Sequence, residues 1–128
     1  MTAATDRAAL RFVTPPPGLA PHTAFALEPV DTDAGLFSLA AIDEPGIRVF
    51  VVDRDAVVPD YAPVLTAAQL QPIGVTSLQD TRVLLVARLT DEGVTVNLLA
   101  PVVVDPCTGV AAQVILEGQD LPVRALLG

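Results

Sequence analysis

The feature that most constrains this chain is a series of short segments in which side chains alternate with a two-residue period. Segment 94–99, VTVNLL, is the clearest case, and this period places its side chains on the two faces of a β-strand. Pro101 cannot donate a ladder hydrogen bond and predicts a break or a sheet edge. Segments 102–104 and 110–116 predict a short strand and a returning strand, joined by the turn DPCTG at 105–109.

Similar segments recur along the chain between clusters of Gly, Pro and Asp. Further strands are expected at 9–14, 23–28, 36–42, 47–52, 82–89 and 121–127. Residues 53–63 predict a polar loop. Thr66 and Ser77 predict the caps of two short helical turns.

These elements together predict the fold class. Eight or nine short strands with short turns indicate an all-β protein, built as a small antiparallel sheet. A flat sheet would leave half of the apolar side chains in water, so we expect the sheet to curl strongly into a barrel-like body. We expect one domain over residues 1–128 with one or two short helices, and a frayed tail at residues 1–8.

Composition limits the classes of function. No apolar run approaches the ~20 residues of a membrane helix, and the first residues lack the pattern of a signal peptide, so we expect a cytoplasmic protein and no membrane partner. The net charge of -8 disfavours direct nucleic-acid binding. It suits a basic protein partner, or it serves only solubility, and both explanations stay open.

Few residues have the chemistry of a catalytic or metal site. One histidine and one cysteine cannot supply the four ligands of a structural zinc, and no phosphate-binding glycine motif is present. We therefore expect no metal and no cofactor. His22 is interpreted as a surface histidine and Cys107 as a plain turn cysteine. Asp53 follows an apolar strand and is the best candidate for an acid–base role, but a solvated turn explains it better. We expect no catalytic residue.

A family resemblance is carried by short motifs that follow one another in a fixed order. They are FVVD at 50–53, PDY at 59–61, NLLAP at 97–101, the apolar strand 102–104, TG at 108–109, QVIL at 113–116 and LPVR at 121–124. This series resembles the FliW family of flagellar assembly factors. The resemblance is most specific over about residues 48–124.

The resemblance implies a function as well as a fold. FliW proteins are small, mostly β and have no known catalytic site; they bind the RNA-binding regulator CsrA and also flagellin. The resemblance thus implies a non-enzymatic regulator that binds a CsrA-like protein and couples flagellin synthesis to flagellar assembly. Two alternatives stay open: a small-ligand-binding or enzymatic β-barrel, and a structural interaction domain with a non-flagellar partner.

Four residues are the candidates for partner binding. Asp53, Asp60 and Tyr61 lie in the polar loop, where acidic groups attract a basic partner and an exposed tyrosine can anchor it. Tyr61 can instead fold onto its own sheet with its hydroxyl satisfied. Asn97 either contacts a partner or bonds the backbone at the break before Pro101.

Overall fold

The computed structural model describes residues 8–16, 18–58, 60–61, 63–116 and 125–126. Within them, nine strands form one sheet. The strands are β1 (Ala8–Phe12), β2 (Ala24–Asp31), β3 (Leu36–Ala41), β4 (Arg48–Asp53), β5 (Arg82–Thr90), β6 (Gly93–Val96), β7 (Val102–Val104), β8 (Val110–Gln113) and β9 (Ala125–Leu126). The helical elements are α1 (Arg54–Val57), α2 (Ala67–Leu70) and the 3-10 turns η2 (Thr32–Ala34), η3 (Gln71–Ile73) and η4 (Leu78–Asp80).

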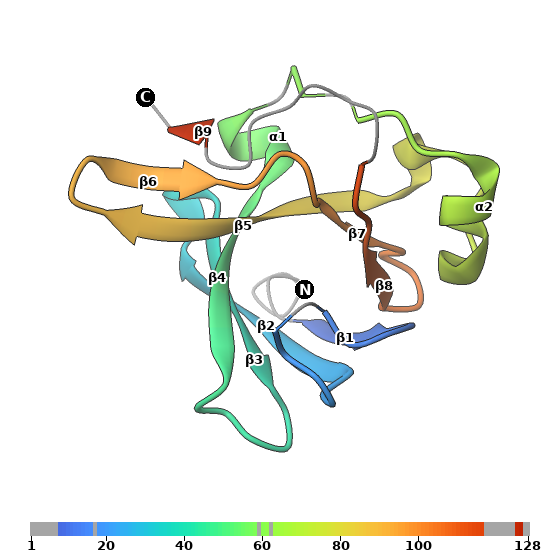
Figure 1. Cartoon of the computed structure of the whole chain (residues 1–128), viewed down its shortest axis with the longest axis horizontal. Helices are drawn as coiled ribbons and strands as arrows, with labels where there is room; N and C mark the ends of the chain where they lie inside the picture. The colour runs from blue at the N-terminus through green and yellow to red at the C-terminus, as the bar shows by residue number, and fades with distance from the viewer. Residues whose placement is uncertain (1–7, 17, 59, 62, 117–124, 127–128) are drawn as a thin grey trace.

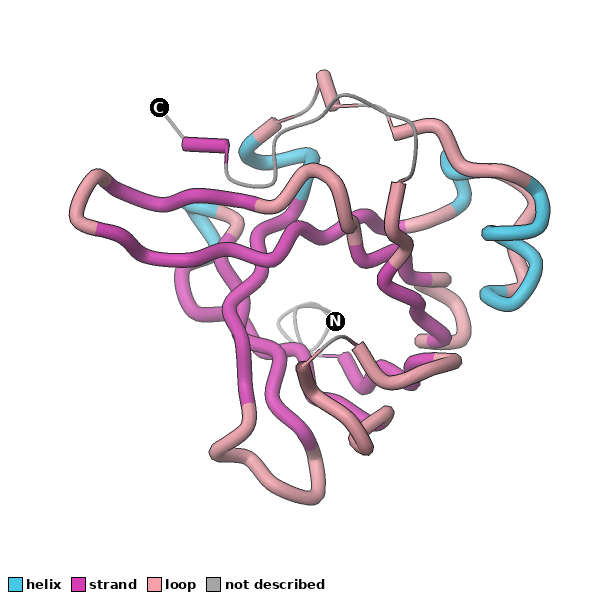
Figure 2. Tube along the Cα trace, viewed as in Figure 1, coloured by secondary structure: helices cyan, strands magenta, loops and turns pink. Residues whose placement is uncertain are grey.

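The sheet curls into a ring, as Figures 1 and 2 show. Its strand order is β4-β3-β2-β1-β8-β7-β5-β6-β9, and a further pairing between β4 and β5 closes the ring. Strands β6 and β9 continue outward from β5 beyond the closure. The expected all-β, strongly curled fold with short helices is therefore confirmed.

One strand pair departs from the expected antiparallel arrangement. β1 and β8 pair in parallel, with Arg11 opposite Val110 and Phe12 opposite Ala111. The sheet is mixed for this reason. The alternation of side chains specifies which face a residue occupies, but it carries no information on the direction of a neighbouring strand. The parallel pair joins segments nearly a hundred residues apart, and no turn motif links them.

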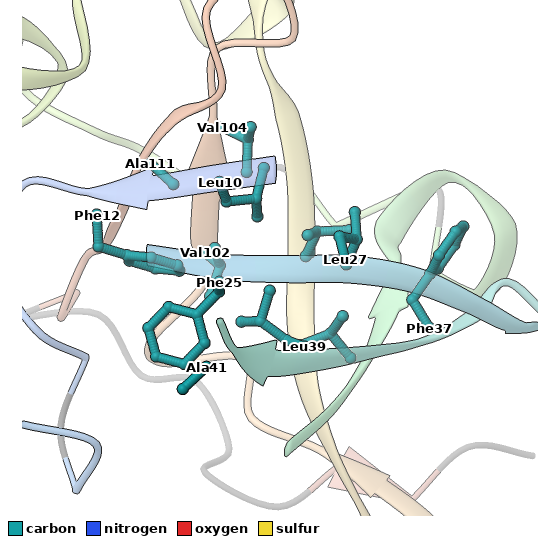
Figure 3. Close-up of a cluster of buried hydrophobic side chains, with 12 residues drawn as sticks. Leu10, Phe12, Phe25, Leu27, Phe37, Leu39, Ala41, Val102, Val104 and Ala111 are labelled. Atoms are coloured by element: carbon teal, nitrogen blue, oxygen red, sulfur yellow. The ribbon is translucent and has the colours of Figure 1, made fainter. Parts of the chain in front are cut away.

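The inside of the ring holds the main core. Phe12 and Phe25 meet edge to face with ring centroids 5.4 Å apart, an arrangement that aromatic pairs favour. Val51 and Leu84 contribute from the two strands that close the ring. The buried members of this cluster, most of them labelled in Figure 3, are Leu10, Phe12, Phe25, Leu27, Phe37, Leu39, Ala41, Val51, Leu84, Val102, Val104 and Ala111.

Short helical elements cover parts of the outer face. Leu70 of α2 and Ile73 of η3 are buried against Val103 on the outside of β7. Thr66 caps α2 as expected and forms a capping box with Gln69. Ser77 also caps as expected, accepting a hydrogen bond from the amide of Gln79. A second cover, formed by α1 and the chain after it, lies over β4 and β5.

Several boundaries differ from the sequence predictions. The expected polar loop at 53–63 contains the helix α1, and β8 ends at Gln113 rather than 116. Ala8, assigned to the frayed tail, is the first residue of β1. Pro59 of the PDY motif lies outside the described residues, as does the segment 117–124 with the LPVR motif and the start of the strand expected at 121–127.

Candidate functional site

Asp53 is the residue at which strand β4 becomes helix α1. One oxygen of its carboxylate, Oδ1, accepts a hydrogen bond from the amide of Asp55 at 3.1 Å, as a helix N-cap does. The other oxygen, Oδ2, lies 3.0 Å from Nε of Arg82. Only 21% of the Asp53 side chain is exposed. The expected solvated turn is therefore wrong for Asp53, because its carboxylate is held by two intramolecular partners.

Arg82 connects this carboxylate to the core. Its guanidinium lies 4.8 Å from the ring centroid of Phe37, a distance typical of cation–π contacts. Phe37 itself is buried inside the ring of strands. The charge of Arg82 is thus shared between the carboxylate of Asp53 and an aromatic face. This contact ties the start of α1 to strands β3 and β5.

Tyr61 lies over the outer face of the sheet. Its hydroxyl donates a hydrogen bond to the carbonyl of Leu98, and its own carbonyl accepts one from Nη1 of Arg54 at 3.1 Å. The ring packs against a cluster that includes Val52 and Leu85. Burial raises the pKa of Tyr61 from 10.0 to about 12, although the positive charge of Arg54 acts to lower it. The alternative in which Tyr61 folds onto its own sheet with a satisfied hydroxyl describes this geometry.

Asn97 occupies the break that follows strand β6. Its side-chain oxygen accepts a hydrogen bond from the backbone N–H of Leu99 at 2.9 Å. The backbone N–H of Asn97 donates to the carbonyl of Val86 at 3.1 Å. The expected backbone role before Pro101 is confirmed. This turn also presents the carbonyl of Leu98 to Tyr61, so Asn97 and Tyr61 act on the same short segment.

The structure thus places the four candidate residues in two roles. Asp53, Tyr61 and Asn97 hold the local backbone. Asp60 is exposed. Asp55, which was not among the candidates, is 79% exposed, and its Oδ1 lies 3.0 Å from Nε of Arg54. Recognising Asp53 as an N-cap would have drawn attention to Asp55, because acidic residues are favoured in the first turn of a helix.

We call residues 53–58 and 60–61, with Asn97, the α1 ridge. Its exposed carboxylates are those of Asp60 and Asp55, and the second is paired with Arg54 of the same ridge. Such charges act on an approaching partner over about a Debye length, ~8–10 Å at physiological salt. The ridge is rigidly tied to the sheet by Asp53 and Tyr61. It can present an acidic surface to a protein, and its described residues form no nucleophile–base pair.

The residues excluded from chemistry at the outset behave mostly as expected. Cys107 is exposed, and its amide donates to Asp105 within the turn. His22 is more buried than a surface histidine, and its Nε2 lies 3.7 Å from Glu44. Among the described residues, no three His, Cys, Asp or Glu side chains gather in a group able to hold a metal ion. None of the helices in this part of the chain is long and apolar enough to cross a membrane.

Comparison with protein families gives a match over nearly the whole chain. The family described as FliW protein matches residues 1–127, including the N-terminal part where the motifs were weakest. A flagellar assembly factor FliW from Heliobacterium modesticaldum is 34% identical over 115 residues, covering 88% of this chain and 74% of the relative. One from Thermotoga neapolitana is 33% identical over 92 residues, covering 70% of this chain and 62% of that protein.

A solved structure has the same fold. It is described as the crystal structure of the flagellar assembly factor FliW, with a TM-score of 0.81 and 22% identity. The match covers 92% of this chain and 84% of the solved chain. A further relative, from Geotalea uraniireducens, is 31% identical, and this chain spans 54% of its length.

Proposed function

This chain belongs to the FliW family of flagellar assembly factors, and from that premise we propose that it is a non-catalytic regulator that binds other proteins. The proposed partners are a CsrA-like translational regulator and flagellin. The observation that carries the proposal is the family match over residues 1–127. In this proposal the chain holds the regulator away from flagellin messages, and flagellin competes for it. Synthesis of filament protein is thereby coupled to its use in assembly.

Charge supports a basic partner. The chain carries a net charge of -8, and a protein that binds RNA needs positive charge to contact phosphates. The opposite signs attract the two proteins and speed their encounter. The proposal needs no direct contact between this chain and nucleic acid, and it places the chain in the cytoplasm, where translation occurs.

The α1 ridge is the surface proposed for this contact. Asp55 and Asp60 are its exposed carboxylates, and they supply the attractive rim. The other three candidates, Asp53, Tyr61 and Asn97, hold the backbone of the ridge in place through the hydrogen bonds described above. A preorganised surface loses less conformational entropy on binding than a flexible loop does. Tyr61 is half-buried, and its accessible surface adds contact area beside the charges.

The test measures binding to each proposed partner directly. The purified chain is immobilised, and purified CsrA-like protein and flagellin from the same cell are applied separately and then together. We expect each to bind alone and the second to reduce binding of the first. Failure of both partners to bind, with the chain folded, would reject the proposal and leave the non-flagellar interaction domain as the alternative.

A further inference from the structure

The outer face of the sheet carries an apolar strip of which only one end is covered. At the covered end, Val52 and Leu85 lie beneath α1 and Tyr61. Farther along the strip, Phe50 of β4 lies opposite Ala87 of β5. At its outer end, Leu89 of β5 lies opposite Val94 of β6. Side chains two residues apart share a face, so this outer end continues the same surface. Leu89 is 72% exposed there.

Two strands diverge at the uncovered end. β4 and β5 pair from Asp53 opposite Leu84 as far as Phe50 opposite Ala87. Beyond that point the range 88–90 of β5 pairs with β6, and the range 48–49 of β4 pairs with β3. Figure 1 shows the β5–β6 hairpin and the β3–β4 hairpin leaving the ring in different directions. The closing seam of the ring therefore opens at this end.

A hollow of about 190 Å³ lies at this opening. Its walls come from five strands and are almost entirely apolar: they are formed by Val30, Leu36, Phe50, Ala87, Arg88, Leu89 and Val94. A cavity of about 150 Å³ with such a lining holds a benzene molecule. The hollow thus has room for one aromatic or large aliphatic side chain, and we call it the seam hollow.

Four acidic residues follow or precede the lining residues of the seam hollow along the chain, and we take them as its rim. Asp31 follows Val30 and lies opposite Leu36, and Asp33 lies in the following turn η2. The turn between β5 and β6 is formed by Asp91 and Glu92, which lie two residues from Leu89 and Val94 respectively. All four carboxylates are on exposed residues.

Two arginines lie at the walls of the seam hollow. Arg88 lines the hollow. The guanidinium of Arg48 lies 5.5 Å from the ring centroid of Phe50, which shows that this aromatic wall already accommodates a guanidinium. Four carboxylates against two guanidinium groups leave the rim negative, in a chain whose net charge is also negative.

We propose that the seam hollow is a docking site for a basic segment of a partner protein, one that inserts a bulky apolar side chain between flanking arginines or lysines. The apolar side chain fills the hollow and supplies affinity. Its basic neighbours meet Asp31, Asp33, Asp91 and Glu92, which select against neutral and acidic segments. This site is separate from the α1 ridge, and the inference does not rest on the identity of the regulator proposed above.

Short synthetic peptides test the site without any named partner. The probe peptide has one phenylalanine between arginines; two matched peptides carry glutamine in place of arginine, or alanine in place of phenylalanine. Binding to the isotope-labelled chain is followed by NMR. We expect the probe to shift amide signals of Val30, Leu89 and Val94, with an affinity that falls as salt rises. Both matched peptides are expected to bind several-fold more weakly.

Surface variants provide matched controls. Val30 is 53% exposed and Ile42, in the turn after β3, is 50% exposed, so serine at either position leaves the core intact. We expect Val30→Ser and Leu89→Ser each to weaken the probe peptide about threefold to tenfold, and Ile42→Ser to leave its affinity unchanged. Equal binding of the glutamine peptide, shifts confined to the α1 ridge, or self-association of the chain through Leu89 would each overturn the proposal.

Discussion

The Nε atom of Arg82, the first residue of β5, lies 3.0 Å from Oδ2 of Asp53, the last residue of β4. The same carboxylate caps α1 through its other oxygen. One side chain therefore joins the seam of the ring to the helix that covers its outer face. Both side chains are partly buried, so salt screens their attraction less than it would at an open surface. The position of the α1 ridge depends on this pair.

The first prediction concerns stability at Asp53. Asp53→Ala removes the N-cap and the ion pair together, so we expect the free energy of unfolding to fall by about 1–3 kcal/mol. Asp53→Asn keeps an oxygen that can cap the helix and should cost less than half as much. Urea denaturation of both variants measures the difference. Equal losses for the two variants would show that the cap contributes nothing.

The second prediction concerns the hydroxyl of Tyr61. Tyr61→Phe leaves the carbonyl of Leu98 without its donor and keeps the ring, so we expect a loss of about 0.5–1.5 kcal/mol. Tyr61→Ala also uncovers apolar surface near Val52 and should cost about 2–4 kcal/mol. Thermal and urea unfolding check both values. Two variants as stable as the parent would mean that the ring does not cover the sheet in solution.

The third prediction concerns alkaline pH. Tyr61 is the sole tyrosine, so ultraviolet absorbance reports its ionisation alone. Its pKa in the folded protein is raised to about 12 because of burial, with the charge of Arg54 opposing the shift. The folded state then binds the proton more tightly than the unfolded state does. The resulting stability is fully present below about pH 10 and is lost as the pH rises toward about 12. An ordinary midpoint near 10 in the folded chain would contradict this.

The fourth prediction concerns the parallel pairing of β1 with β8. Gly109 has a φ of +80°, and a Cβ there would lie 2.5 Å from the carbonyl oxygen of Ala9 in β1. Gly109→Ala should therefore destabilise the fold by about 2–5 kcal/mol and increase amide exchange in β1 and β8. Gly74→Ala is the control, because Gly74 has a φ of +89° but open space around its Cβ position. A similar loss for both would mean that the clash with β1 has no effect.

The sequence allowed the strands to be predicted far better than their arrangement. The described strands lie within a few residues of the predicted ones, since most of them bury one face and show the two-residue period. The parallel pairing of β1 with β8 was not predictable, because it joins segments distant in the sequence. The helix α1 was also missed: its four residues are too few for a periodic signal, and only the capping geometry of Asp53 reveals it.

The sequence named candidate residues for partner binding, but it did not specify what their side chains contact. Motif resemblance brought Asp53, Tyr61 and Asn97 to attention, and the structure brings all three to one ridge. Their side chains are directed to neighbouring backbone or to Arg82, which no linear pattern specifies. Asp55 was passed over as a binding residue because acidic residues are common in any turn.

The last prediction distinguishes two roles at the α1 ridge: attracting the partner protein by charge, and holding the backbone of the ridge in place. Asp55→Asn and Asp60→Asn each remove one exposed negative charge, so we expect slower association with the CsrA-like protein and a weaker dependence on salt, with little change in dissociation. Asp43→Asn removes an exposed charge from the turn between β3 and β4 and serves as the control.

Tyr61→Phe completes this comparison, because it weakens the support of the ridge without changing its charge. Its main effect should be faster dissociation, with association unchanged. Binding kinetics at low and physiological salt, measured on variants shown to be folded, distinguish the two effects. If Asp43→Asn slows association as much as Asp60→Asn does, the partner responds to the net charge of the chain and the ridge is not its docking surface. The seam hollow would then be the first place to look for the contact.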